Sequence, residues 1–219
     1  MVTSRRPPER TRVRRTELLE QLRTEFLSKG FLGQSVADLA AELHCSKSTL
    51  YLVARSKEQI VLETVNFFFT SAAERIEIKV AERTAPADRL ACYLMSVADE
   101  LHPAAPRFME DLAAFEPAAA VYRRHTRAAA RRVHELVDEG VAAGDLRPVN
   151  AAFVGAAVAT VMTAIQNGEI ENATGLADAE AYRNLADLVL TGLSTAVRPA
   201  TAHASGRRRR VRTATAGTR

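Results

Sequence analysis

The sequence is poor in several residue types that mark other classes of protein. It has no tryptophan and only two cysteines, Cys45 and Cys92, which fall in different predicted helices and suggest no disulfide framework. It has no uncharged apolar run of 18 residues, and residues 149–167 come nearest to one. Because alanine, glycine and threonine dominate that run, we expect a buried helix there rather than a membrane span. The Arg- and Pro-rich N-terminus lacks the apolar stretch of a secretion signal, so we expect a cytoplasmic protein without membrane contacts.

Motifs that carry catalysis or bind metal are also missing from the sequence. It has no phosphate-binding loop, no nucleophile elbow and no metal-spaced cysteine pair. His125 and His134 are nine residues apart, which places them on opposite sides of one helix, where they cannot share a metal ion. Glu110 and Asp111 have no acid–base partner nearby in the chain. We therefore expect no enzymatic activity, no cofactor and no metal site.

Charge is distributed unevenly along the chain. Residues 1–57 hold 11 Lys and Arg against 6 Asp and Glu, and residues 198–219 hold 7 Arg and no acid. Residues 58–197 hold 12 basic and 20 acidic residues, so a net charge of −8 separates ends of +5 and +7. A basic head on an acidic body is typical of a protein that seeks phosphate, although each block taken alone could be an ordinary solvated surface.

Residues 35–57 are predicted to form two short helices and the start of a third. Ser35 is a suitable N-cap, and apolar residues recur behind it at helical spacing. Ser46 restarts the pattern after an interruption at His44 and Cys45, and Ser56 with Gln59 has the form of a capping box. Two short helices joined by a tight turn predict a helix-turn-helix, in which the second helix reads DNA.

Three segments of this region carry a family resemblance. Ala-Asp-Leu-Ala at 37–40, Ser-Lys-Ser-Thr-Leu-Tyr at 46–51 and Ser-Lys-Glu at 56–58 resemble the N-terminal module of tetracycline-repressor (TetR) family regulators. The resemblance covers roughly residues 12–62 and fades beyond them. It implies the following contacts with double-stranded DNA: Ser35, Tyr51 and Lys57 on phosphates, Lys47 and Ser48 on base edges or phosphates, Thr49 in support, and Leu52 beside them.

Two positions depart from the family pattern. His44 stands where the turn commonly has glycine, and we expect it to adopt positive φ with some strain. Ala54 stands where an aromatic residue usually wedges the recognition helix, which leaves the seating of residues 52–55 open. The serines could also serve only as N-caps, and Lys57 or Tyr51 alone would be an ordinary surface side chain. Their joint spacing favours the DNA contacts.

The rest of the chain predicts helices, so the fold class is all-α with about nine helices. We expect a flexible basic arm at 1–11, a helix-turn-helix domain at 12–72 with its motif at about 35–54, a helical ligand-binding and dimerisation domain at 73–198, and a disordered Arg-rich tail at 199–219. Residues 168–176 are expected to be a loop. The helix at 149–167 is apolar nearly all round, which requires cover on two sides.

The resemblance further implies a homodimeric repressor of a near-palindromic operator, released by a small-molecule effector. Candidate pocket residues, for each of which ordinary core packing is the simpler reading, are Tyr93, Phe108, Met109, Phe115, Tyr122, Phe153 and Met162. Dimerisation through the last two helices gives as candidate interface residues Val154, Val158, Val161, Tyr182, Leu185, Val189 and Leu193.

One other function stays open on the sequence. The Arg-rich tail and a ridge on the helix around residue 127 could belong to an architectural or partner-binding DNA protein without a small-molecule ligand. The ridge consists of Arg123, Arg124, Arg127, Arg131 and Arg132. It could equally be a solvated face paired with Glu135 and Asp138.

Overall fold

The computed structural model describes residues 9–195, which form ten α-helices and no strand beyond a single isolated bridge between Leu146 and Ser194. The expected all-α class is confirmed, but the count of nine helices was one short. The additional helix, α9 (Glu169–Thr174), lies in the expected loop between two left-handed glycines, Gly168 and Gly175. None of the helices between residues 9 and 195 has the length and apolar character that crossing a bilayer requires. The Arg-rich tail, most of the basic arm and the expected end of the last helix lie outside the described residues.

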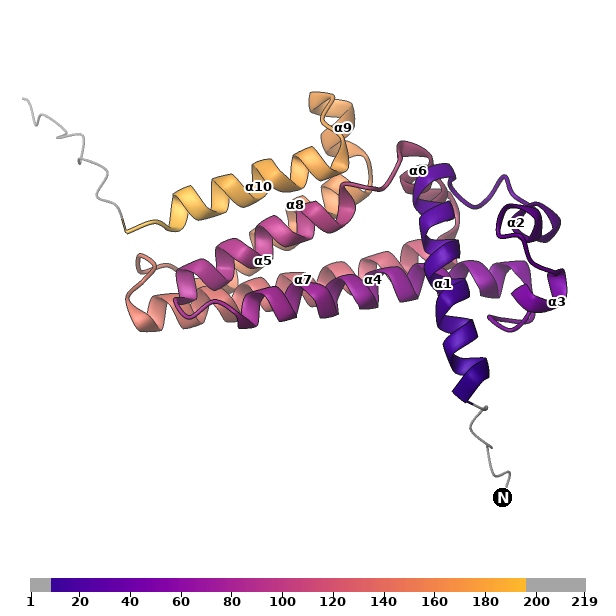
Figure 1. Cartoon of the computed structure of the whole chain (residues 1–219). Helices are drawn as coiled ribbons and strands as arrows, with labels where there is room; N and C mark the ends of the chain where they lie inside the picture. The colour runs from indigo at the N-terminus through magenta and orange to yellow at the C-terminus, as the bar shows by residue number, and fades with distance from the viewer. Residues whose placement is uncertain (1–8, 196–219) are drawn as a thin grey trace, which may run out of the picture.

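Three helices and the start of a fourth form a small head at one end of the elongated molecule (Figure 1). They are α1 (Glu9–Lys29), α2 (Val36–Glu42), α3 (Lys47–Leu50) and the first turns of α4 (Lys57–Ala81). Their contact is an apolar core that includes Leu22, Leu39, Leu50 and Ile60, all fully buried. Burial of these four side chains contributes about 1.5–3 kcal/mol each, before the entropy cost of ordering the chain.

Serines begin α2, α3 and α4, as the sequence predicted. The Ser35, Ser46 and Ser56 hydroxyls accept hydrogen bonds from the backbone N–H groups of Asp38, Thr49 and Gln59 at 3.1–3.2 Å. The reciprocal bond of a capping box occurs at Ser35, whose N–H donates to Asp38 Oδ2 at 2.8 Å. It does not occur at Ser56, because Gln59 Oε1 accepts instead from the Arg55 N–H.

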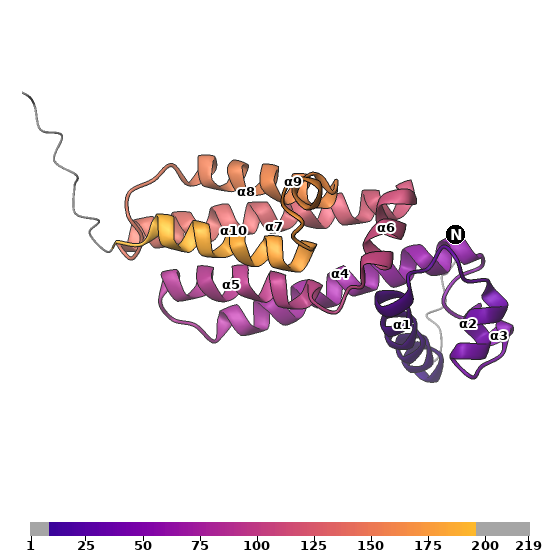
Figure 2. The same ribbon diagram turned by 90° about the horizontal axis from the view of Figure 1, so that it is seen from above.

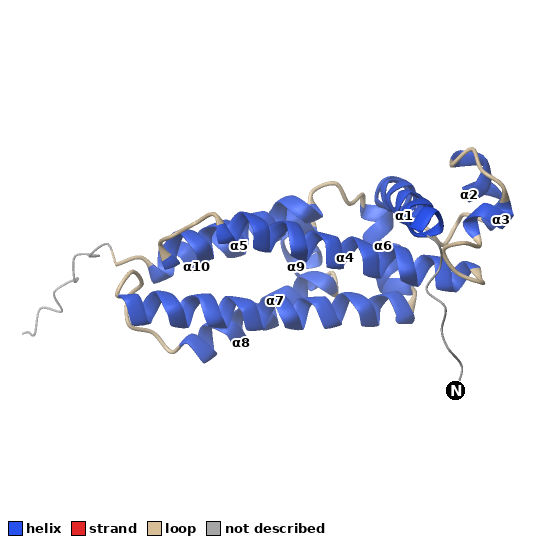
Figure 3. Ribbon diagram, turned by 60° about the horizontal axis from the view of Figure 1, so that its bottom comes forward, coloured by secondary structure: helices blue, strands red, loops and turns tan. Residues whose placement is uncertain are grey.

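The body is a bundle built around two long helices that run along the molecule (Figures 1 and 3). Helix α4 packs on α1 in the head and on α5 (Pro86–Leu101) and α7 (Glu116–Ala143) in the body, so it belongs to both parts. The short α6 (Pro106–Ala114) lies between α1 and α7. Prolines at the first turns of α5, α6 and α7 fit there because these positions need no intrahelical N–H.

The last two long helices, α8 (Ala151–Gln166) and α10 (Asp178–Leu193), lie side by side in contact with each other (Figure 2). Helix α8 packs on α7 so closely that a Cβ at Gly155 would lie 2.9 Å from the His134 Cβ. One side of α8 is therefore buried, through Val158, Met162 and Ile165. Its other side is open in the single chain, where Phe153 is 72% exposed.

One buried carboxylate joins the head to the body. Asp111 of α6 is 2% exposed, and its Oδ2 accepts hydrogen bonds from the backbone N–H groups of Phe31 at 2.6 Å and Leu32 at 2.7 Å. Gly30 precedes this pair with φ +74°, and a Cβ there would lie 2.5 Å from the same Oδ2. The fully buried Phe31 ring packs edge-on against Phe108 at 6.0 Å between centroids. Asp111 thus fixes the turn that follows α1 onto α6.

Removing this carboxylate should lower the stability of the whole chain. Asp111→Ala leaves the Phe31 and Leu32 N–H groups without their acceptor, so we expect the free energy of unfolding to fall by about 3 kcal/mol. Urea denaturation followed by circular dichroism measures the change. Glu110→Ala is the matched control, because the Glu110 side chain is 64% exposed and only pairs with Arg107. Its expected effect is within about 0.5 kcal/mol, and equal losses in the two variants would contradict the role assigned to Asp111.

Candidate functional site

The turn between α2 and α3 has the strained backbone that the sequence predicted. His44 has φ +48°, the only positive φ of a non-glycine residue among residues 9–195. The His44 and Cys45 N–H groups donate to the carbonyls of Ala41 and Ala40 at 3.1 and 2.9 Å, which closes the end of α2. Cys45 is partly buried and packs against the core as a small apolar side chain. The turn thus sets the angle between the two short helices.

Helix α3 presents most of the predicted DNA-contact residues on its outer side. Lys47 and Ser48 are exposed, as are Tyr51 and Leu52 just after the helix, with exposed fractions of 47% and 42% for the last two. The Ser46 hydroxyl lies 2.7 Å from the Ser48 hydroxyl and 2.8 Å from that of partly buried Thr49, so the N-cap orients both. The inner side of α3 is core, as expected for Leu50.

The sequence left open how residues 52–55 pack. The burial of their side chains shows which of them face the core. Val53 is 6% exposed and belongs to the core, while Ala54 packs partly against it. Val53 therefore occupies the inward place next to α4, and Leu52 points outward. The turn Tyr51–Leu52–Val53 continues α3 without an aromatic wedge, since the Leu52 and Val53 N–H groups still donate to the Thr49 and Leu50 carbonyls.

Ser35 and Lys57 lie near this outer side. Hydrogen bonds from Ser35 lower the pKa of Asp38, and the charges of Lys47 and Lys57 lower it further, so both lysines lie close to the N-terminus of α2. The Lys57 ammonium donates to the Leu32 carbonyl at 2.9 Å. It holds the turn before α2 in this structure, a role that the sequence did not suggest. Contact of Lys57 with a phosphate would require this hydrogen bond to be given up or shared.

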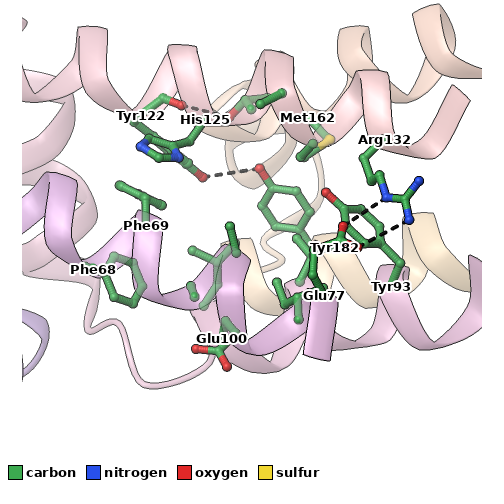
Figure 4. A pocket seen from close by; sticks show the side chains of 18 residues that line it. Phe68, Phe69, Glu77, Tyr93, Glu100, Tyr122, His125, Arg132, Met162 and Tyr182 are labelled. Carbon is green, nitrogen blue, oxygen red and sulfur yellow. Dashed lines mark hydrogen bonds and ion pairs between the residues drawn. The ribbon is translucent and has the colours of Figure 1, made fainter. Parts of the chain in front are cut away.

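A second candidate site is a cavity of about 210 Å³ in the body, between α4, α5, α7, α8 and α10 (Figure 4). Three of the predicted pocket residues line it, namely Tyr93, Tyr122 and Met162. The sequence reasoning missed three further ring side chains in the lining, Phe68, Phe69 and His125, because their spacing is equally that of ordinary core positions. The cavity has aromatic walls supplied by helices far apart in the sequence.

Four predicted pocket residues do not line this cavity. Phe108 is buried in the core below the head, 6.0 Å from the Phe31 and Phe68 rings, and Phe115 packs against Phe31. Met109 lies at a separate hollow between α6, α8 and α10. Phe153 faces away from the core on the open side of α8. The helical periodicity of these residues indicated one apolar side for each helix but not which neighbour that side meets.

The predicted interface residues are mostly covered within one chain. Val158, Tyr182, Leu185 and Leu193 are buried, and Val154, Val161 and Val189 pack partly against the core. Tyr182 lines the cavity instead. The sides of α8 and α10 that carry the four buried residues pack within the chain, where the main neighbours of these helices are α7 and α5, so these four side chains offer little surface to a second subunit. The large apolar side chains left exposed on these two helices are Phe153 and Leu188, which is 71% exposed.

Burial keeps the ionisable rings around the cavity uncharged. The Tyr122 and Tyr182 hydroxyls lie 3.2 Å apart, and burial raises the pKa of Tyr182 to about 12 and that of Tyr122 well above its usual range. Burial also raises the pKa of Tyr93. It lowers the pKa of His125, with the Arg124 charge acting in the same direction. At neutral pH the tyrosines are therefore protonated and the histidine is neutral.

A comparison with protein families matches the N-terminal part of the chain. Residues 18–64 match the sequence model of bacterial regulatory proteins of the tetR family. The comparison with curated proteins gave no match.

Several solved structures share the fold. A TetR/AcrR-family transcriptional regulator from Thermobifida fusca is 23% identical, with a TM-score of 0.58 over 82% of this chain and 98% of that one. A transcriptional regulator from Saccharomonospora viridis in complex with choline is 17% identical, with a TM-score of 0.60 over 82% of this chain and 97% of that one. The ketosteroid transcriptional regulator of Mycobacterium tuberculosis is 19% identical, with a TM-score of 0.52 over 89% and 97%. At these identities the likeness is one of fold.

The strain at His44 can be measured. A left-handed backbone costs a non-glycine residue about 1–2 kcal/mol, partly offset in His44→Gly by the greater freedom of glycine in the unfolded chain. We therefore expect His44→Gly to raise the free energy of unfolding by about 0.5–1 kcal/mol. Ala41→Gly, at an ordinary helical position of α2, is the matched control and should lower it by about 1 kcal/mol. Denaturation curves in which both variants lose stability would argue against strain at the turn.

Proposed function

We propose that the chain, whose residues 18–64 match the sequence model of the tetR family and whose fold is that of TetR-family regulators, is a homodimeric transcriptional repressor of this family. It binds a near-palindromic operator and releases it when a small molecule fills the cavity in the body. We assign DNA binding to residues 12–72 and ligand binding with dimerisation to residues 73–198. Such a protein works in the cytoplasm, where the DNA is. The observation that carries the proposal is the exposed outer side of α3 beside the capped N-terminus of α2.

The chemistry of that outer side suits a DNA backbone and its base edges. The Lys47 ammonium and the Tyr51 hydroxyl are donors of the kind that phosphates accept, and the N-terminus of α2 at Ser35 adds backbone donors. Ser48 and Leu52 have short or apolar side chains that fit base edges in the major groove. Because α3 is a single turn, one head reads a half-site only, so specificity requires two heads.

The open sides of α8 and α10 are the proposed contact between subunits. Phe153 and Leu188 are exposed on adjacent helices, and Ala157 lies in the same open stretch of α8. Large exposed apolar side chains on helices in contact are typical of an interaction surface, and a two-fold axis through it would bury these side chains in both subunits. This surface is at the opposite side of α8 from the residues packed on α7. It replaces the interface expected from the sequence.

Release would act through α4, which passes from the cavity wall to the head. Phe68, Phe69 and Ile76 of α4 line the cavity, while its first turn packs beside α3 and holds the turn at Leu32 through Lys57. An effector shifts operator binding only by as much as it binds the DNA-incompetent arrangement more tightly. A molecule that displaces α4 in the body therefore also displaces the base of the recognition helix.

The arginine ridge on α7 offers little support for the architectural alternative. Arg123 pairs with Glu116, Arg124 donates to Asn66, and Arg132 contacts three carboxylates. Arginines already engaged in this way lose a protein contact for each phosphate they would gain. Three of the five arginines of the ridge therefore have partners within the chain, whereas Arg127 and Arg131 are exposed and make no ion pair among the described residues. The Arg-rich tail lies outside the described residues.

Selection from random duplexes at about 0.15 M salt, repeated without the tail, tests the function. We expect an inverted repeat that survives truncation, whereas salt-sensitive binding without a motif would support the architectural protein. On the selected duplex, Lys47→Ala should weaken binding about tenfold. It should also reduce the slope of log affinity against log salt by about 2 per dimer, since each half-site loses one phosphate contact.

Controls separate contact from folding. Lys79→Ala removes an exposed lysine from the body end of α4 and should leave the affinity unchanged. Tyr51→Phe removes only a hydroxyl and should weaken binding by a smaller factor than Lys47→Ala. Unchanged operator binding by Lys47→Ala and Tyr51→Ala in a folded dimer would refute the assignment of α3 as the reader.

Oligomeric state tests the proposed interface. Phe153→Asp places a charge where we expect two buried rings to meet, so dimer dissociation should become at least about a hundredfold more favourable. Sedimentation at several protein concentrations measures it. Ile78→Asp is the matched control, because Ile78 is an exposed apolar residue of α4, 64% exposed. A wild-type protein that sediments as a monomer, or a Phe153→Asp variant that stays dimeric, would contradict this interface.

A further inference from the structure

We propose that the cavity in the body takes a neutral, largely apolar compound of one or two rings, which makes one hydrogen bond to His125. The inference rests on the proposed function only in treating the cavity as the effector site. The proposal narrows the effector from any small molecule to a neutral compound of one or two rings. It also assigns His125 as a residue that determines specificity.

The size of the ligand follows from the volume and the walls of the cavity. Rings of Phe68, Phe69, Tyr93 and Tyr122 face it, together with the alanines Ala72 and Ala129 (Figure 4). A dry apolar cavity of about 150 Å³ in another protein binds benzene. At about 210 Å³, this cavity has room for one or two fused rings. The lining alanines widen it, because larger side chains at those positions would fill the space.

The charge state of the ligand follows from the partners of the charged side chains at the edge of the cavity. Glu77 makes two contacts with Arg132, at 2.9 and 3.3 Å, and Glu100 makes two with Arg75, at 3.1 and 2.6 Å. Each carboxylate that lines the cavity is thus neutralised by a guanidinium that binds it in two places. A charged ligand would lose its water without gaining an unpaired counter-charge, which is costly in an apolar site.

The polar contact of the ligand follows from the one fully buried side-chain polar atom of the lining that has no hydrogen-bond partner. The Tyr122 and Tyr182 hydroxyls pair with each other, and the Thr126 hydroxyl both donates to the Tyr122 carbonyl and accepts from Gln166. His125 Nε2 is buried and has no hydrogen-bond partner in the structure. A buried polar atom left unpaired carries a cost that a ligand group can relieve.

The imidazole is also held in place for this contact. Its ring stacks on Phe69, with centroids 5.4 Å apart and planes 25° apart, and Phe69 in turn stacks on Tyr122 at 5.0 Å. Because the His125 ring is neutral, either of its tautomers is available, so Nε2 can accept from a hydroxyl or donate to a carbonyl. A stacked ring with a buried, unpaired nitrogen selects for the position of a polar group, not for charge.

A cation is the rival class of ligand, since aromatic faces attract cations and a regulator of the same fold binds choline. Two observations weigh against it in this chain. The guanidinium of Arg132 lies at the edge of the cavity. The carboxylates that would favour a cation are already paired. The aromatic side chains of this cavity therefore serve mainly as an apolar contact surface for the ligand, and not as a site for a cation.

Calorimetry on the full-length protein without DNA tests the inference with four probes of equal ring size. They are naphthalene, 2-naphthol, 2-naphthoate and (2-naphthylmethyl)trimethylammonium. We expect 2-naphthol to bind at least about tenfold more tightly than either charged probe, and about fivefold more tightly than naphthalene because of the hydrogen bond. His125→Phe should reduce 2-naphthol to the affinity of naphthalene. His102→Phe, at an exposed histidine outside this cavity, should leave all four affinities unchanged.

Imidazole resonances locate the bound probe. In the wild-type protein, 2-naphthol should shift the His125 signals, identified by their loss in His125→Phe, and leave those of His102 in place. Tighter binding of a charged probe, no binding of any probe, or an unchanged preference for 2-naphthol in a folded His125→Phe variant would each overturn the proposal. These outcomes are independent of the duplex selection, so failure here leaves the DNA-binding function standing, and failure there leaves the ligand class standing.

Discussion

The contact on which the arrangement of the molecule depends is that of the Asp111 carboxylate with the Phe31 and Leu32 N–H groups. It satisfies two backbone donors that the end of α1 leaves without partners, in a place that water does not reach. Lys57 holds the same turn from the other side, through the Leu32 carbonyl. The turn is therefore bound to α6 and α4 together. The Phe31 ring, packed against Phe108, and a backbone hydrogen bond from the Ala105 N–H to the Leu27 carbonyl at 2.8 Å also join α6 to the head.

That connection gives the cavity and the DNA-facing side a common framework. Helix α4 supplies part of the cavity wall and the base of the head, and α6 carries both Asp111 and the Phe108 ring that packs under Phe31. Packed cores resist gradual deformation, so a displacement of α4 or α6 in the body moves the head as a unit. The paired carboxylates around the cavity contribute in a second way. Because they are neutralised within the chain, the negative charge of the body remains on its surface, away from the site.

The sequence correctly predicted the features that depend only on residues close together in the chain. The N-cap role of Ser35, Ser46 and Ser56 and the positive φ of His44 follow from the backbone of a few residues, and all of them occur. Helix α9 was missed because its six residues have no buried side chain and hence no apolar periodicity. The capping box was placed at Ser56 although it forms at Ser35. Gln59 is long enough to bond Arg55 instead, and the sequence does not indicate that choice.

What the sequence by itself determined is the all-α class, the helix-turn-helix and the side of α3 that faces outward, because helical period and capping depend on neighbours in the chain. What only the tertiary structure decided is which neighbouring helix packs against the apolar side of each helix. Tyr182 of α10 lines the cavity, and Phe153 of α8 is exposed on the open side of its helix. Asp111, which has no acid–base partner nearby in the chain, bonds a turn 80 residues away. A periodic apolar side shows that a helix is covered, but the partner that covers it depends on how all ten helices pack at once.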